Sequence, residues 1–143
     1  LRFKIPTAYR EVEEAGLKLD TSLGFTEQWG FRNSYGLPFM PYDQERERVL
    51  KIVEAPLHVM DRTFYRDQVH ASQASPMVID WMEQNKTNCV FTLNFHNNFF
   101  YSFKYHGYTR FYTNLLKWMK ESGIKSITEE EMIREYHRPD LFS

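Results

Sequence analysis

The segment Cys89-Val90-Phe91-Thr92-Leu93-Asn94-Phe95-His96-Asn97-Asn98 joins an apolar run to a histidine and a polar loop. The run over 90–95 is rich in β-branched and aromatic residues, which predicts a buried strand. His96 then stands at the carboxyl end of that strand, where parallel α/β folds bind their ligands. An imidazole in this place can donate a proton near neutral pH. From its position, His96 is either a catalytic acid or a structural histidine bonded to the Asn-rich loop.

Strands and helices alternate on both sides of this segment. Helices are predicted from Pro6 to Gly16, from Ser75-Pro76 to about Lys86, and over 108–122, and a capping box at Thr128 opens a last helix. Further strands are predicted over 49–53 and 124–127, and residues 33–48 read as a long irregular loop. This alternation predicts an α/β fold with mostly parallel strands. About four strands fit either half of an eight-unit barrel, which needs about 250 residues, or a small open sheet.

The composition indicates a single globular domain over residues 1–143. Hydrophobic residues make up 42% and aromatic residues 17%, which is enough to build a core and excludes a disordered class. The formal net charge of −1 provides no broad basic surface, so we do not expect a nucleic-acid partner. The apolar runs are far shorter than the roughly 20 residues that span a bilayer. Cys89 is the one cysteine, which excludes an internal disulfide and leaves the compartment open.

Several short segments together resemble one known family. They are Gly16 to Phe25 with Gly30-Phe31-Arg32, Pro38-Phe39 through Pro41-Tyr42-Asp43, Glu54-Ala55-Pro56-Leu57 with Met60-Asp61, and Phe95-His96-Asn97-Asn98. In order and spacing, over most of residues 1–136, they resemble bacterial polysaccharide deacetylase-like domains, the NodB-homology group or carbohydrate esterase family 4. The resemblance implies a distorted (β/α) barrel. It also implies a divalent, zinc-like metal, held by one Asp and two His, that activates a water to attack an acetyl carbonyl.

The resemblance also implies roles for particular residues. His96 matches the general acid of the family, and Asp20 is the best match for the aspartate that orients it. Arg2 is a candidate for the arginine that steadies the general base. The residues that we expect to bind substrate are Arg32, Tyr42, Asp61, Asn97 and Asn98.

Two other groups leave alternatives open. His58 and Asp61 follow a predicted strand, so they either line the same mouth as His96 or belong to a solvated turn. The aromatic residues between Phe99 and Tyr108 either stack on sugar rings or pack around the mouth of the fold.

The metal-ligand motifs of the family are missing from this chain. The five histidines stand at 58, 70, 96, 106 and 137, so no two of them have the i, i+4 spacing of H-x-x-x-H. We therefore expect no metal in this chain, a divalent metal in an intact parent domain, and no activity of the chain alone. The chain is either the C-terminal half of a longer deacetylase-like barrel or a degenerate relative. Half a barrel exposes strand edges, so we expect self-association through them.

The leading hypothesis is therefore part of a metal-dependent hydrolase that removes acetyl groups from a polysaccharide or oligosaccharide. In this hypothesis residues 33–43 shape the substrate groove. The first alternative is a non-catalytic carbohydrate-binding or structural module of the same fold. The second is an unrelated α/β domain that binds a protein partner, which predicts no saturable sugar binding.

Overall fold

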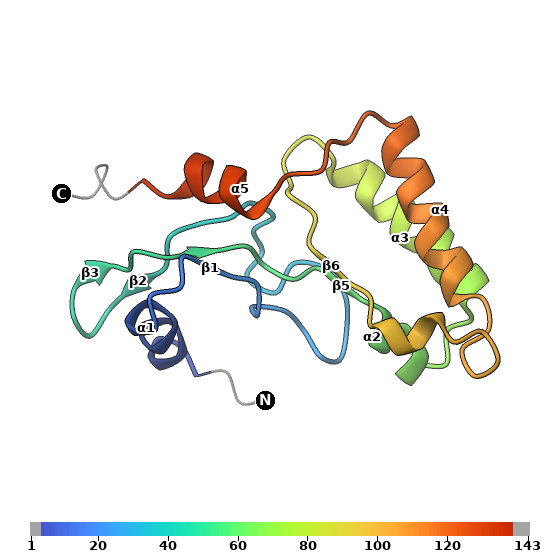
Figure 1. Ribbon diagram of the computed structural model, residues 1–143, viewed down its shortest axis with the longest axis horizontal. Helices are drawn as coiled ribbons and strands as arrows, with labels where there is room; N and C mark the ends of the chain where they lie inside the picture. Colours follow the sequence, from blue (N-terminus) through green and yellow to red (C-terminus); the bar gives the residue numbers. More distant parts are fainter. Residues whose placement is uncertain (1–3, 139–143) are drawn as a thin grey trace.

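The computed structural model describes residues 4–138, and Figure 1 shows their arrangement around a long extended segment. The helices are α1 (Thr7–Glu14), α2 (Asp61–Arg66), α3 (Ala71–Asn85), α4 (Tyr108–Glu121) and α5 (Glu129–Tyr136), with a short 3-10 helix η1 (Asn97–Phe100). The strands are β1 (Leu19–Asp20), β2 (Tyr42–Asp43), β3 (Arg48–Val49), β4 (Val53–Glu54), β5 (Val59–Met60) and β6 (Leu93–Asn94). Each strand has two residues, so the sheets are small and the connections carry much of the chain.

The extended segment contains β4 and β5 in succession. β1 runs parallel to β4, with Asp20 opposite Glu54, and a parallel bridge joins Gly24 to Leu57 further along. β6 runs parallel to β5, with Met60 opposite Asn94. Segments from three parts of the sequence therefore run in the same direction, which agrees with the parallel pairing that the sequence predicts.

One end of the molecule is built from α1 and the β2–β3 hairpin, on the left of Figure 1. The guanidinium of Arg10 in α1 donates to both carboxylate oxygens of Asp43 in β2, at 2.6 and 2.7 Å. This bidentate bond lowers the pKa of the buried Asp43 to about 2. A small buried cluster lies beneath it and comprises Tyr9, Leu50 and Ile52.

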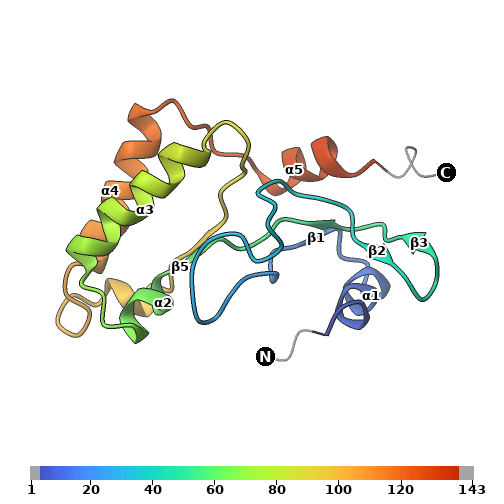
Figure 2. The ribbon, with the colours of Figure 1, turned by 180° about the vertical axis from the view of Figure 1, so that it is seen from behind.

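The other end is built on α3 and α4, which pack side by side (Figures 1 and 2). In α4 the buried residues Tyr108, Phe111 and Leu115 recur every three or four positions, so they form one apolar stripe. The main buried cluster comprises Val59, Phe64, Ala71, Ala74, Val78, Met82, Phe99, Tyr108, Phe111 and Leu115. It joins both helices to β5, α2 and η1, and so supports the segments that follow β5 and β6.

Three of the predicted helices are confirmed. α1 begins at Thr7, α4 spans Tyr108–Glu121, and Thr128 forms the predicted capping box with Glu131. The predicted start of α3 at Ser75-Pro76 is wrong, since the helix begins at Ala71 and contains Pro76. The start is set instead by the side chain of His70, which accepts a hydrogen bond from the Ser72 backbone N–H.

Two strand predictions are wrong and one is too long. Residues 124–127 form no strand, because in the described chain they pair with no neighbour and their side chains line a cavity between α4 and α5. The strand expected over 49–53 is split between β3 and β4, with Leu50 and Ile52 turned into the small cluster. The strand expected over 90–95 is reduced to Leu93–Asn94. The irregular loop expected over 33–48 contains the β2–β3 hairpin.

The described residues form a mixed α/β structure with two small parallel sheets and one antiparallel hairpin. Residues 4–138 show no closed barrel, and the incomplete deacetylase-type barrel remains a prediction. In this same range, no helix is both long enough and apolar enough to cross a membrane.

Candidate functional site

Asp61 and His96 meet where two parallel strands end. Asp61 follows β5 directly as the first residue of α2, and His96 stands two residues beyond β6, just before η1. Because β5 and β6 are parallel and in register, both side chains emerge at the same edge. The sequence predicts this place for His96 and offers Asp61 as a substrate-binding residue at the same mouth; the structure instead buries Asp61 and bonds it to His96.

Asp61 holds His96 at two points. One carboxylate oxygen, Oδ1, lies 2.7 Å from Nδ1 of the His96 ring. The other oxygen, Oδ2, accepts the backbone N–H of His96 at 2.6 Å. The Asp61 side chain is 0% exposed, whereas the His96 side chain is 39% exposed. A buried carboxylate therefore fixes both the ring and the backbone of a histidine that reaches solvent.

This geometry determines which nitrogen of His96 can act on a ligand. An ionised carboxylate only accepts hydrogen bonds, so Nδ1 carries the proton that it shares with Asp61. Nε2 is then the nitrogen left to exchange a proton with a bound molecule. A carboxylate that orients an imidazole and stabilises its charged form is the arrangement used by acid–base catalysts.

The structure does not bring Asp20 to His96, so the predicted Asp20–His96 pair is corrected to Asp61–His96. Asp20 lies opposite Glu54 in the β1–β4 pair, and Asp61 follows Glu54 by seven residues along the extended segment. Seven residues of extended chain span about 23 Å. Asp20 instead accepts a hydrogen bond from the hydroxyl of Ser22 at 2.5 Å.

Two of the expected substrate-binding residues lie on other parts of the fold. Tyr42 is exposed in β2, on the hairpin at the opposite end of the molecule from α2 (Figure 1). The guanidinium of Arg32 donates to the Gly24 carbonyl at 2.6 Å. Its positive charge partly opposes the rise in the pKa of Tyr9. Arg2 lies outside the described residues.

Asn97 and Asn98 follow His96 directly along the chain. Both are exposed and open the 3-10 helix η1. Their exposed amide groups can both donate and accept hydrogen bonds. Their role in substrate binding remains a prediction.

His58 lies beneath the site and not at its mouth. Its ring is buried between Phe31 and Trp81, with ring centroids 5.2 and 6.1 Å away. Its Nδ1 accepts the Thr92 backbone N–H at 3.3 Å. Burial lowers the pKa of His58 to about 4, so the ring is neutral at pH 7. His58 therefore links the segment before β5 to the segment before β6.

Glu54 lies at the centre of a second cluster of titratable residues, which was not predicted from the sequence. Its side chain is 0% exposed, and one carboxyl oxygen accepts the Leu23 backbone N–H at 3.2 Å. Burial, and then the negative charge of Asp20, raise the pKa of Glu54 to about 9. Burial and Glu54 raise the pKa of the neighbouring Tyr9 as well. The signal in the sequence was an acidic residue within the apolar run Val53-Glu54-Ala55.

Replacing Glu54 with glutamine should make the protein more stable at pH 8 than the wild type. The folded state holds a proton on Glu54 up to about pH 9, whereas an unfolded glutamate loses it near pH 4.5. Between these values the folded state binds the extra proton, so the wild-type free energy of unfolding falls as pH rises. At about 1.4 kcal/mol per pH unit this loss is on the order of 3 kcal/mol by pH 7 and larger at pH 8, and glutamine, which cannot ionise, avoids it.

Urea unfolding of both proteins at pH 5 and pH 8 measures this effect. Glu121→Gln, on the exposed face of α4, is the control for losing one negative charge. A stability difference between Glu54→Gln and wild type that is equal at both pH values would contradict the prediction.

Residues 4–138 contain no group of three or more His, Cys, Asp or Glu side chains arranged to hold a metal ion. The described residues therefore do not fit the metal that the family resemblance implies.

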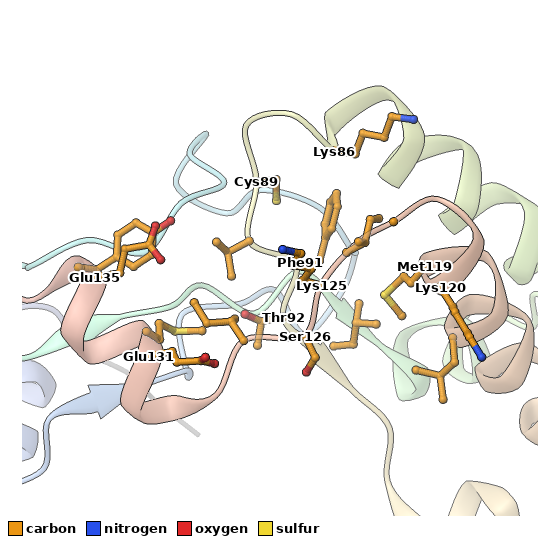
Figure 3. A pocket seen from close by; sticks show the side chains of 18 of the residues that line it. Lys86, Cys89, Phe91, Thr92, Met119, Lys120, Lys125, Ser126, Glu131 and Glu135 are labelled. Carbon is orange, nitrogen blue, oxygen red and sulfur yellow. The ribbon is translucent and has the colours of Figure 1, made fainter.

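A separate cavity of about 1320 Å³ lies on the other side of β6. Figure 3 shows its walls: Phe91 and Thr92 before β6, Met119 in α4, and Glu131 in α5. Neither Asp61 nor His96 lines it. The cavity is thus distinct from the exposed edge where His96 meets solvent.

Asp61 and His96 form a geometry suited to proton transfer, held by the ends of β5 and β6. Comparison of the chain with models of known protein families, with curated proteins and with solved structures gives no match.

Proposed function

We propose that this chain carries the proton-donating part of a hydrolase that removes acetyl groups from a sugar polymer. The observation that supports this most is the pair of hydrogen bonds that the Asp61 carboxylate accepts from the His96 backbone and ring, which leaves Nε2 of a partly exposed side chain free of both bonds. The family resemblance, which places a general acid at His96, supplies the acetylated sugar as the substrate class.

His96 acts when the acetyl group leaves. Water adds through its oxygen to the carbonyl carbon, one of its protons passes to a base that the rest of the intact domain would supply, and a tetrahedral intermediate forms. The bond from that carbon to the sugar oxygen or nitrogen then breaks, and acetate departs. The protonated His96 delivers the proton on Nε2 to the sugar atom as this bond breaks. Asp61 stabilises the imidazolium before transfer and holds the ring in position throughout.

Replacing His96 with alanine should lower acetate release by about 10²–10⁴-fold, the usual contribution of a positioned acid. The assay uses the intact protein that carries this chain, with acetylated oligosaccharides as substrates, and measures free acetate. Asn97→Ala, measured in the same assay, gives the effect of losing the neighbouring side chain, which we expect to bind substrate. Near-wild-type turnover by His96→Ala contradicts the assignment, as does the absence of acetate release from every acetylated glycan offered.

We also propose that copies of the chain associate through the free edge of β6. Among residues 4–138, β6 has β5 as its one strand partner, and Val90 to Leu93 line the cavity beyond its other edge. An open edge beside apolar side chains is a template for strand pairing. Sedimentation equilibrium should show a fraction of dimer that rises with protein concentration. A monomer at every concentration contradicts this proposal.

A further inference from the structure

Bulky aromatic rings are exposed together on the connection from η1 to α4. Phe103 is 80% exposed and Tyr101 is 62% exposed, with ring centroids 6.2 Å apart, and Phe100 precedes them at the surface. Figures 1 and 2 both show this connection, in orange, looping out of the molecule before the start of α4. Folded proteins rarely gather exposed apolar side chains where they meet no partner or membrane. We call Phe100, Tyr101 and Phe103 the aromatic tip.

The tip differs from the aromatic residues that pack beneath it. Phe99 stacks on Tyr105 with ring centroids 4.3 Å apart, and the buried Tyr108 lies 5.0 Å from Phe99. All three contribute to the main buried cluster. The backbone N–H groups of Lys104 and Tyr105 donate to the Tyr101 carbonyl, at 3.2 and 3.0 Å, and so close the turn above them. Packing therefore accounts for the lower rings and leaves the tip at the surface on an ordered turn.

The shape of the tip favours a broad partner surface over a small ligand. Small ligands bind in concave sites that cover most of their surface. None of the three rings lines the cavity of about 1320 Å³. The turn projects from the molecule, and Phe103 near its end is its most exposed ring. A projecting turn of this kind can insert its side chains into a partner, whereas it encloses nothing itself.

The charge around the tip is positive. The stretch 97–120 contains no Asp or Glu, although the whole chain has a net charge of −1. Its basic residues are Lys104, Arg110, Lys117 and Lys120. Lys104 directly follows Phe103, and Arg110 is exposed in the first turn of α4. Aromatic rings favour the boundary between lipid headgroups and acyl chains, and adjacent basic groups are attracted to anionic lipid phosphates.

We infer that the aromatic tip docks the protein on the surface of an anionic lipid bilayer. Tyr101 and Phe103 enter the headgroup region, and Lys104 and Arg110 lie beside the lipid phosphates. This inference does not depend on the proposed function, since it uses no property of the reaction. The two surfaces are neighbours, because the Phe99 ring lies 6.0 Å from the His96 ring, centroid to centroid. Docking therefore holds the Asp61–His96 edge close to the lipid surface.

The test is co-sedimentation of the protein with vesicles made of equal parts phosphatidylcholine and phosphatidylglycerol. We expect saturable binding that weakens at high salt, because salt screens the basic groups. Tyr101→Ala/Phe103→Ala should bind at least about tenfold more weakly, since two apolar rings no longer leave water. Its circular dichroism should stay unchanged because both rings are largely exposed. Tyr35→Ala, at a tyrosine 48% exposed on another connection, is the matched control and should bind like wild type.

A charge variant separates the contributions of the rings and the basic groups. Lys104→Gln should weaken binding to the mixed vesicles and leave binding to pure phosphatidylcholine vesicles unchanged. His96→Ala should bind the mixed vesicles like wild type, so the vesicle assay and the acetate assay can fail independently.

Four outcomes overturn the inference. The first three are no binding to the mixed vesicles, equal binding by the double variant and wild type, and an equal loss in Tyr35→Ala. The fourth is self-association, or saturable binding of an oligosaccharide, that Tyr101→Ala/Phe103→Ala abolishes while vesicle binding is absent. That result would assign the tip to a second copy of the chain or to a sugar.

Discussion

Under the proposed function, replacing Asp61 with asparagine should lower acetate release nearly as far as replacing His96 with alanine, by about 10²–10⁴-fold. The asparagine side chain has almost the same shape, but it has one oxygen in place of two and carries no charge. It can accept from the His96 backbone or from the ring, and its NH₂ group favours the ring tautomer with the proton on Nε2. The charged imidazole also loses its partner, so a correctly placed ring becomes a poor acid.

The measurement compares turnover of Asp61→Asn, His96→Ala and the double variant in the intact protein. If the two residues act as a unit, the double variant should be no slower than the slower single variant. Asp67→Asn, at an exposed carboxylate just beyond α2, is the control and should leave turnover unchanged. Full additivity of the two single effects would show that Asp61 and His96 act separately.

Truncating Phe111 to alanine should lower the free energy of unfolding by about 3–5 kcal/mol, the usual cost of removing a buried phenylalanine ring. Phe111 is 1% exposed in α4 and packs edge-on against Phe64 and Phe95, with ring centroids 5.4 and 5.2 Å away. Phe64 belongs to the helix that Asp61 begins, and Phe95 precedes His96. The cavity left by the substitution therefore lies beneath both members of the pair.

Leu116→Ala is the matched control, because Leu116 stands on the same helix and is 44% exposed. Its effect should stay within about 0.5 kcal/mol. Chemical unfolding of the three proteins gives the comparison. Equal destabilisation by the two substitutions would mean that the packing of α4 against α2 and the His96 segment does not support this end of the molecule.

Local signals in the sequence were sufficient for most helices. The capping box at Thr128 and the apolar stripe of α4 use residues three or four positions apart, so they can be read along the chain. α3 was placed five residues late because proline at the first turn is a common signal, and Pro76 lies inside the helix instead. Its true start depends on the His70 ring, an uncommon cap.

The strands were harder to place because pairing partners lie far apart in the sequence. The apolar run over 90–95 predicts a long strand, but only Leu93–Asn94 pairs with β5. The run over 124–127, which has an isoleucine at each end, has no strand partner among the described residues. An apolar run indicates that a segment is buried. It does not distinguish a segment that packs against side chains from one that pairs within a sheet.

Both His96 and Asp61 were predicted as site residues, but the hydrogen bonds between them were not. The strand-then-polar pattern that identifies His96 also occurs in Val59-Met60-Asp61, where an acidic residue follows a short apolar run. That pattern places Asp61 at a strand end, but the β5–β6 register decides that it meets His96. Register is a property of two distant segments, and so the resemblance alone led to Asp20.

The two buried clusters described above share no residue in the part of the chain that the structure covers. Cooperative unfolding requires that the loss of one packed region destabilise the next, and one segment that joins the two regions is the extended one that holds β4 and β5. The end with α1 and the hairpin buries only three residues in its cluster, so its amide protons should exchange with solvent through partial opening at low energy. The Asp61–His96 edge belongs to the larger unit and can outlast that opening intact.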